Sequence, residues 1–245
     1  MSSELTVAIV AYNRPEYIRT QVLGLRNFLF PCPNIVYLYN GSHEMQGVFS
    51  DICRESEVEF VVTPDSCKQT SNPSDNHSRC LDWFVGCGGL TRYVGFLDHD
   101  IFLFNRLKML EILNNHPAYG LRHRQNGFHY FWPGCFFVDS KDTSLSFGIF
   151  KGKDTGAGWD WSQVKKDYVY AVSHRYLENS DEKQKNTIEV FDDKWVHFLG
   201  ASEWNGKISD RKRIIIGKIV ETLNYYAVAL IDDKIFNVLT GEVIV

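Results

Sequence analysis

The segment that most constrains this chain is the apolar run over residues 93–104, which carries Asp98 and Asp100 one residue apart. Such runs are typical of buried strands, and charged side chains are almost never buried unless they are paired or bound to metal. We therefore expect the pair where a strand opens to solvent or to a ligand. In extended chain both carboxylates point to the same side, and Mg²⁺ or Mn²⁺ between them would relieve their repulsion. The alternative is a polar strand end with a solvated turn.

The composition suits one α/β domain in a reducing compartment. The chain has 245 residues, 44% of them hydrophobic, which is enough for a sizeable core. Its 26 basic and 30 acidic residues give a net charge of −4, so no nucleic-acid partner is predicted. None of the six cysteines forms a C-x-x-C pair. With no signal-peptide pattern and no apolar run near the roughly 20 residues of a membrane span, we expect a cytoplasmic protein.

Strand and helix patterns alternate over the first hundred residues. Apolar runs and amphipathic stretches predict strands and helices in turn at Leu5–Ala11, Glu16–Phe30, Ile35–Tyr39, Met45–Glu55 and Val58–Thr63. This alternation indicates a parallel sheet with helices on its faces. Ligands of such sheets bind beyond the carboxyl ends of the strands.

The second half of the sequence is less regular and carries three notable segments. Phe128–Val138 is rich in aromatic residues and is expected to be core, with Trp132 at the rim of a pocket. Lys151–Trp161 combines glycines and tryptophans with two aspartates. His197 is the only polar residue in the run Trp195–Leu199.

These motifs, in this order, resemble the nucleotide-sugar-dependent glycosyltransferases of the GT-A fold, close to the family-2-like enzymes. The run Val7–Pro15 is similar to the usual opening strand and turn, and Asn40–Ser42 to the turn after the second strand. Asp98-His99-Asp100 resembles the D-x-D motif, and Trp195–Phe198 the late histidine segment. The resemblance covers roughly residues 5–205 and is strongest over 5–104. It departs at Asn40, where the family usually has an acidic residue.

The resemblance implies a Rossmann-like, mostly parallel central sheet with flanking helices and an irregular C-terminal half. Residues 1–245 would form a single domain, with a nucleotide-sugar-binding half at 1–104 and an acceptor-side half with a C-terminal extension at 105–245. The implied activity is the transfer of a hexosyl group from a UDP- or GDP-linked sugar to an acceptor hydroxyl, as in a glycan. Mn²⁺ or Mg²⁺ would stabilise the diphosphate leaving group.

The resemblance also assigns roles to individual residues. Asp98, Asp100 and His197 would hold the metal, with His197 favouring Mn²⁺. The donor would contact seven residues: Ala11, Tyr12, Asn13, Arg14, Asn40, His77 and Asp98. Three of these residues have an alternative position. His197 could lie in the core, His77 at the surface, and Arg14 at a solvated helix start. His99 is expected on the opposite side of the strand, as packing or behind the ligands.

An inverting transferase needs a base that takes the proton of the acceptor hydroxyl. Asp154 and Asp160 are the candidates, because both lie in the Gly/Trp-rich segment after the D-x-D motif. A helix cap is the alternative for Asp154, and a cap or an exposed loop acid for Asp160. A retaining enzyme would need no such base.

Two other classes of function remain open from the sequence. A nucleotidyltransferase would normally show a Gly-rich phosphate loop with a basic residue after the first strand, and residues 12–15 lack one. A non-catalytic sugar- or nucleotide-binding protein would have little use for the Asp98/Asp100 pair.

Overall fold

The computed structural model describes residues 3–88, 90–125, 128–141, 145–148, 155, 169–171, 173–176, 188–201, 213, 214, 216–218 and 221. Three sheets are formed by these residues. The main sheet consists of β1 (Leu5–Ala11), β3 (Asn34–Tyr39), β4 (Glu59–Val62), β5 (Tyr93–Asp98), β8 (Ala118–Gln125), β9 (Phe128–Asp139) and β10 (Val169–Ala171). The second sheet consists of β6 (Ile101–Leu103), β11 (Ser173–Tyr176), β12 (Ile188–Phe191) and β13 (Trp195–Phe198). A two-stranded sheet pairs β2 (Leu29–Phe30) with β7 (Leu107–Lys108).

The main sheet is mixed but mostly parallel, as predicted. Its strand order is β10-β8-β9-β5-β1-β3-β4. The central strand β1 runs parallel to β3 and β5, and β4 runs parallel to β3. The long strand β9 pairs antiparallel with both β5 and β8, while β10 runs parallel to β8. The parallel half therefore brings the carboxyl ends of β1, β3 and β5 to one edge.

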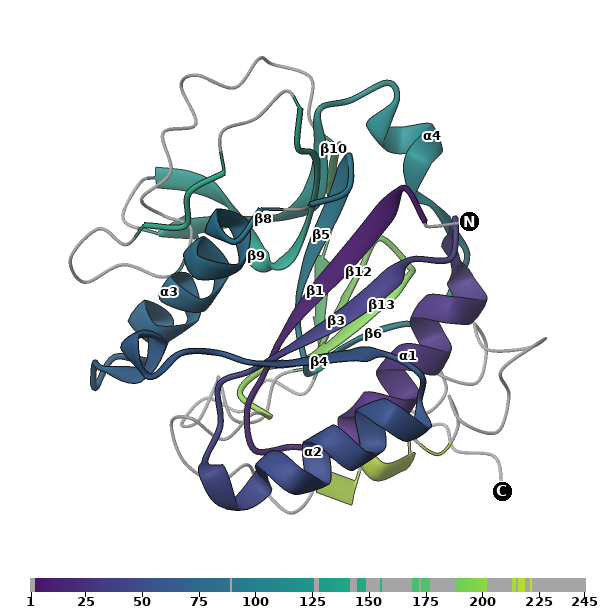
Figure 1. Ribbon diagram of the computed structural model, residues 1–245. Helices are drawn as coiled ribbons and strands as arrows, with labels where there is room; N and C mark the ends of the chain where they lie inside the picture. Colours follow the sequence, from purple (N-terminus) through teal and green to yellow (C-terminus); the bar gives the residue numbers. More distant parts are fainter. Residues whose placement is uncertain are drawn as a thin grey trace.

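Helices cover both faces of this sheet (Figure 1). They are α1 (Tyr17–Phe28), α2 (His43–Glu55), α3 (Pro73–Gly86) and α4 (Met109–Leu113), with a short 3₁₀ helix η1 (Asp65–Lys68). All seven residues of β1 are buried. Its odd-numbered side chains pack with α1 and α2, whereas Ala8 and Val10 pack with α3. No helix within the described ranges is long and apolar enough to cross a membrane.

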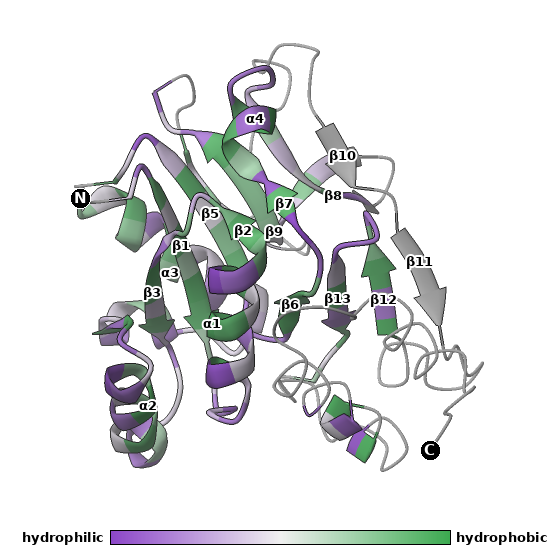
Figure 2. Ribbon diagram, turned by 90° about the vertical axis from the view of Figure 1, so that its right-hand side faces the viewer, coloured by the Kyte–Doolittle hydropathy of each residue, from purple (hydrophilic) through white to green (hydrophobic). Residues whose placement is uncertain are grey.

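The apolar run over residues 93–104 is divided between the two sheets, and the aspartate pair lies where β5 ends, as expected. Strand β5 ends at Asp98, residues 99 and 100 form a turn, and β6 then enters the second sheet. There β6 pairs antiparallel with β13, with His197 opposite Ile101 (Figure 2). The late histidine segment thus reaches the D-x-D turn through strand pairing.

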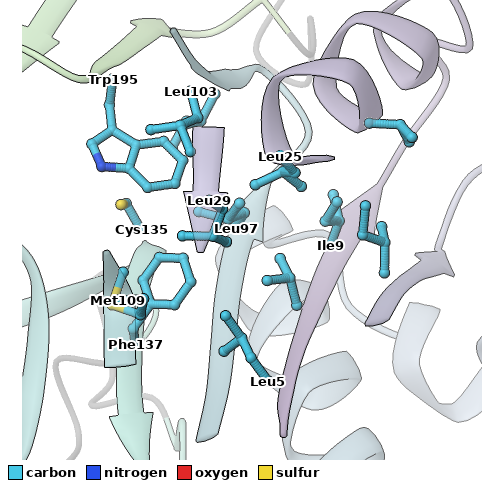
Figure 3. Close-up of a cluster of buried hydrophobic side chains, with 14 of the residues drawn as sticks. Leu5, Ile9, Leu25, Leu29, Leu97, Leu103, Met109, Cys135, Phe137 and Trp195 are labelled. Atoms are coloured by element: carbon cyan, nitrogen blue, oxygen red, sulfur yellow. The ribbon is translucent and has the colours of Figure 1, made fainter. Parts of the chain in front are cut away.

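One apolar cluster joins the two sheets (Figure 3). Trp195 and Leu103 come from the second sheet, and Leu97 and Cys135 from the main sheet, and all four are at most 1% exposed. Helix α1 packs against β6 at Gly24, where an added Cβ would lie less than 3.0 Å from the carbonyl oxygen of Leu103. Such close packing fixes the start of the second sheet relative to α1.

Candidate functional site

The turn between β5 and β6 is held by Gln21, a fully buried residue of α1. Its Nε2 donates hydrogen bonds to the carbonyl oxygens of Asp98 at 2.9 Å and Ile101 at 2.8 Å. Its Oε1 accepts a hydrogen bond from the Tyr37 hydroxyl at 2.9 Å. Gln21 was not identified from the sequence, although a lone polar residue on the apolar face of a helix was a signal.

Asp98 pairs with His77, which lies in α3. His77 Nε2 is 3.2 Å from Asp98 Oδ1, a contact that is electrostatic and not aligned as a hydrogen bond. On the other side of the ring, Nδ1 lies 3.4 Å from Thr155 Oγ1, and the Thr155 hydroxyl donates to the Ser74 carbonyl. His77 is buried, so the alternative of a surface histidine is wrong. The side chain of Asp98 stays 22% exposed and can still meet a ligand.

Asp100 faces His197, and His197 faces Glu189 from β12. His197 Nε2 is 3.6 Å from Asp100 Oδ1, and its Nδ1 is 3.3 Å from Glu189 Oε2. All three side chains are buried, and the ring of Trp132 lies 4.7 Å from that of His197. A cation bound between Asp100 and His197 would place positive charge next to these buried carboxylates and favour their ionised form.

Asp100 and His197 suit a divalent metal ion. They present one oxygen and one imidazole nitrogen toward each other, a donor set that favours Mn²⁺ over Mg²⁺. A carboxylate on the remote ring nitrogen, here that of Glu189, is the arrangement that orients metal-binding histidines. No group of three His, Cys, Asp or Glu side chains in the described part of the chain is arranged to hold a metal. The protein would thus supply few ligands, as at sites where phosphates and water complete the shell.

His99 lies between the two aspartates and turns away from them into the protein. It is 2% exposed and packs 6.0 Å from the ring of Tyr17. Burial lowers the pKa of His99, and the nearby Asp100 opposes this shift. The imidazole is therefore neutral near pH 7, in keeping with the packing role expected from the sequence.

A pocket of about 380 Å³ lies beyond the carboxyl ends of β1 and β3. It includes two of the predicted donor-binding residues, Tyr12 and Asn40, together with Lys68. The remaining lining residues are Gly41, Ser42, Thr70, Ser71, Pro73 and Asn76. Asn76 adjoins His77, which links the pocket to Asp98 through α3. Lys68 escaped the sequence analysis, although it is a basic residue in a stretch of small polar side chains after β4.

Other predicted donor-binding residues shape the pocket from behind. Asn13 Oδ1 accepts hydrogen bonds from the Ser42 amide at 3.0 Å and the Tyr39 hydroxyl at 3.4 Å. This contact joins the turns after β1 and β3. Ala11 is fully buried and acts through its carbonyl, which accepts the amide of Asn40 at 2.9 Å.

The remaining predicted residues are less closely tied to the pocket. Arg14 pairs with Glu16 at 3.1 Å and keeps 21% of its side chain exposed, and its contact with the donor stays a prediction. Asp154 and Asp160, the candidate bases, lie outside the described residues.

No protein-family model matches the chain, and no curated protein matches it in sequence. Several solved structures are similar to it in fold. Galactosyltransferase LgtC, in complex with donor and acceptor sugar analogs, matches with 13% identity and a TM-score of 0.40, over 55% of this chain and 57% of that one. Glucosyl-3-phosphoglycerate synthase from Mycobacterium tuberculosis, with Mn²⁺, UDP and glucosyl-3-phosphoglycerate, gives 11% identity and 0.40, over 56% and 57%.

Mannosyltransferase PcManGT from Pyrobaculum calidifontis, in complex with GDP-Man and Mn²⁺, gives 10% identity and a TM-score of 0.41, over 58% of this chain and 46% of that one. The match therefore spans only about half the length of these proteins, from 46% to 57%. A similarity in fold at 10–13% sequence identity does not assign a chemical role to any individual residue.

Proposed function

We propose that the protein is a metal-dependent glycosyltransferase that moves a hexosyl group from a UDP- or GDP-linked sugar to a hydroxyl of an acceptor such as a glycan. The observation that carries this proposal is the position of Asp100. Asp100 stands at a strand end and contacts His197, which also contacts Glu189. It lies two residues from Asp98. The partner of Asp98, His77, adjoins the 380 Å³ pocket. The pocket would receive the nucleotide, and the aspartate turn the diphosphate and sugar.

Each part of the site has a task in this reaction. Tyr12 offers a ring for stacking on the base, and Lys68 offers an ammonium group at the same pocket. Asp98, held by His77, would accept hydrogen bonds from the ribose or the donor sugar. Asp100 and His197 would hold Mn²⁺ or Mg²⁺, which supplies positive charge to the leaving diphosphate when bound.

The transfer itself joins the acceptor oxygen to the anomeric carbon as the bond from that carbon to the phosphate oxygen breaks. In an inverting enzyme a carboxylate accepts the proton of the acceptor hydroxyl. We assign this role to Asp154 or Asp160 in the acceptor-side half. Asp154→Asn or Asp160→Asn should slow single-turnover transfer by about 100- to 10,000-fold at saturating donor, with nucleotide binding retained, while the other variant stays near wild type. Near wild-type rates for both would place the base elsewhere or indicate retention of configuration.

The decisive experiment is to incubate the protein with a panel of nucleotide sugars, with and without Mn²⁺, and to identify the released product. Metal-dependent release of nucleoside diphosphate supports a glycosyltransferase. Release of pyrophosphate would instead indicate a nucleotidyltransferase. Tight nucleotide binding without turnover over the whole panel would leave a binding protein.

A further inference from the structure

The pocket holds an amide whose hydrogen-bonding polarity is fixed from behind. Asn40 lines the pocket and is only 6% exposed. One atom of its amide group lies 3.1 Å from the Thr63 hydroxyl, the single side-chain contact of Asn40 among the described residues. The other amide atom is therefore left for an occupant. The second amide of the pocket, that of Asn76, is bound at both ends by Thr70.

The Thr63 hydroxyl has one proton, so it can donate a hydrogen bond to only one of its two oxygen neighbours. It lies 3.0 Å from the Tyr39 carbonyl oxygen, which can only accept, and 3.1 Å from the Asn40 atom assigned as Oδ1. If the hydroxyl donated to Asn40, its contact with Tyr39 would be two oxygens at 3.0 Å with no proton between them. If it donates to Tyr39, the Asn40 atom facing it must be the amide nitrogen. The oxygen and nitrogen of an amide are assigned from such partners.

The second arrangement satisfies both contacts of the hydroxyl. The Asn40 nitrogen donates to the Thr63 oxygen, and the Thr63 hydroxyl donates to the Tyr39 carbonyl, as buried polar groups require. The main-chain amide of Thr63 donates to the same carbonyl at 3.1 Å, which holds Thr63 beside Tyr39.

We propose that Thr63 is a specificity-determining residue that turns the Asn40 carbonyl oxygen toward the pocket, so that the pocket selects a base with a ring N–H. This inference rests on the proposed function, because it takes the occupant to be a nucleotide. Uracil and guanine carry an imide-type ring N–H that donates to such an oxygen. The corresponding ring nitrogens of cytosine and adenine carry a lone pair, which would face the oxygen and leave it unsatisfied.

The first test measures nucleotide binding by calorimetry in the presence of Mn²⁺. UDP is compared with CDP and N3-methyl-UDP, and GDP with ADP. Because a buried acceptor left without a donor costs about 1–3 kcal/mol, the preferred base of each set should bind about 10- to 100-fold more tightly. Equal affinity for UDP, CDP and N3-methyl-UDP, and for GDP and ADP, would overturn the inference and leave the proposed function standing. Failure of every nucleotide to bind would overturn both.

Variants then test the part played by Thr63. Thr63→Val keeps the size of the side chain but removes the hydroxyl, so the amide can rotate and the UDP-to-CDP ratio should fall toward one. Thr63→Ser and Asn40→Asp both keep an acceptor in the pocket and should keep the ratio. Thr91→Val is the matched control. The Thr91 hydroxyl bonds to Thr6 near the start of β1, whereas the pocket lies beyond the other end of that strand.

An unchanged base preference in Thr63→Val would show that Thr63 does not set the polarity. If Thr63→Val fails to fold, Thr63→Ser and the N3-methyl-UDP comparison decide the matter. A loss of base preference in Thr63→Ser, which retains the hydroxyl, would equally contradict the inference.

Discussion

Gln21 donates a hydrogen bond to the main-chain carbonyl of Asp98 from 77 residues earlier in the chain. The same amide nitrogen binds Ile101, so one side chain of α1 holds both ends of the turn that carries the two aspartates. Its carbonyl in turn accepts the hydroxyl of Tyr37. Gln21 therefore positions the aspartates through the backbone, without touching their carboxylates in these contacts.

Replacement of Gln21 should damage stability and metal binding together. Gln21→Leu leaves one buried and one partly buried carbonyl without this donor, and at about 1–3 kcal/mol for each the free energy of unfolding should fall by about 2–6 kcal/mol. Denaturant unfolding measures this loss, and calorimetry with Mn²⁺ should show weaker binding. Gln46→Leu on α2 is the control and should stay within about 0.5 kcal/mol. A Gln21→Leu protein as stable as the wild type would show that Gln21 does not hold the turn between β5 and β6.

The metal site makes a second prediction. Asp100→Asn keeps the size of the side chain but removes the charge, so Mn²⁺ binding in the presence of UDP should weaken by at least about 100-fold, which is a few kcal/mol. His197→Ala should weaken it to a smaller extent, because Asp100 remains. Electron paramagnetic resonance of free Mn²⁺ measures both. Asp51→Asn, an exposed aspartate paired with Arg54, should leave the affinity unchanged.

Glu189 offers a prediction that separates metal binding from stability. Glu189→Gln still accepts a hydrogen bond from His197 but removes one of the two buried carboxylates. Mn²⁺ affinity should fall about 10- to 100-fold, as it does when a carboxylate behind a histidine ligand is removed. Without metal, the variant should be about as stable as the wild type, because glutamine keeps the size of the side chain and the hydrogen bond to His197. Glu111→Gln, on an exposed face of α4, is the control for both measurements.

His99 predicts how stability depends on pH. Its folded-state pKa lies below the value of about 6.5 expected in the unfolded chain, so the unfolded state binds the proton more readily. The stabilisation is present above pH 6.5 and is lost as the pH falls below it, by up to about 1.4 kcal/mol per pH unit. Urea unfolding at pH 7.5 and pH 5.5 should show a smaller pH-dependent loss in His99→Gln than in the wild type. The same pH dependence in both proteins would exclude His99 as its source.

Gly24 tests the contact between α1 and the second sheet. Gly24→Ala would place a methyl group against the backbone of Leu103, and overpacking of this kind destabilises by about 1–3 kcal/mol. Gly47→Ala is a matched control, because nothing lies within 4 Å of a Cβ added there. It should stabilise α2 by about 0.4–1 kcal/mol. Thermal unfolding of the two variants should therefore shift in opposite directions.

The sequence predicted the elements whose signals are local. The strand Leu5–Ala11 has the predicted bounds, and the turns at Tyr12 and Asn40 lie at one edge of the sheet as expected. The division of residues 93–104 was missed, because the chain is apolar on both sides of the turn. The helix expected to reach Phe30 ends at Phe28, since Leu29 and Phe30 pair with a strand at Leu107.

The site shows the same limit. Asp98 and Asp100 stand out because each is charged within an apolar run, and the late His197 was found by resemblance. Gln21 and Glu189 are single polar residues in apolar surroundings, and their importance depends on partners that only the folded chain brings near. The roles proposed for Asp154 and Asp160 stay predictions.

The pairing of β6 with β13 sets an order of events during synthesis. Asp100 leaves the ribosome 97 residues before His197 (197 − 100), which is about 5–20 s at 5–20 residues per second. The parallel strands of the main sheet can form in that interval, while the Asp100 carboxylate still lacks its imidazole. A nascent chain stalled before residue 188 would therefore have the 380 Å³ pocket but no Glu189 or His197. At the proposed site, capture of a metal ion would consequently be a late event, and it would report that the second sheet has formed.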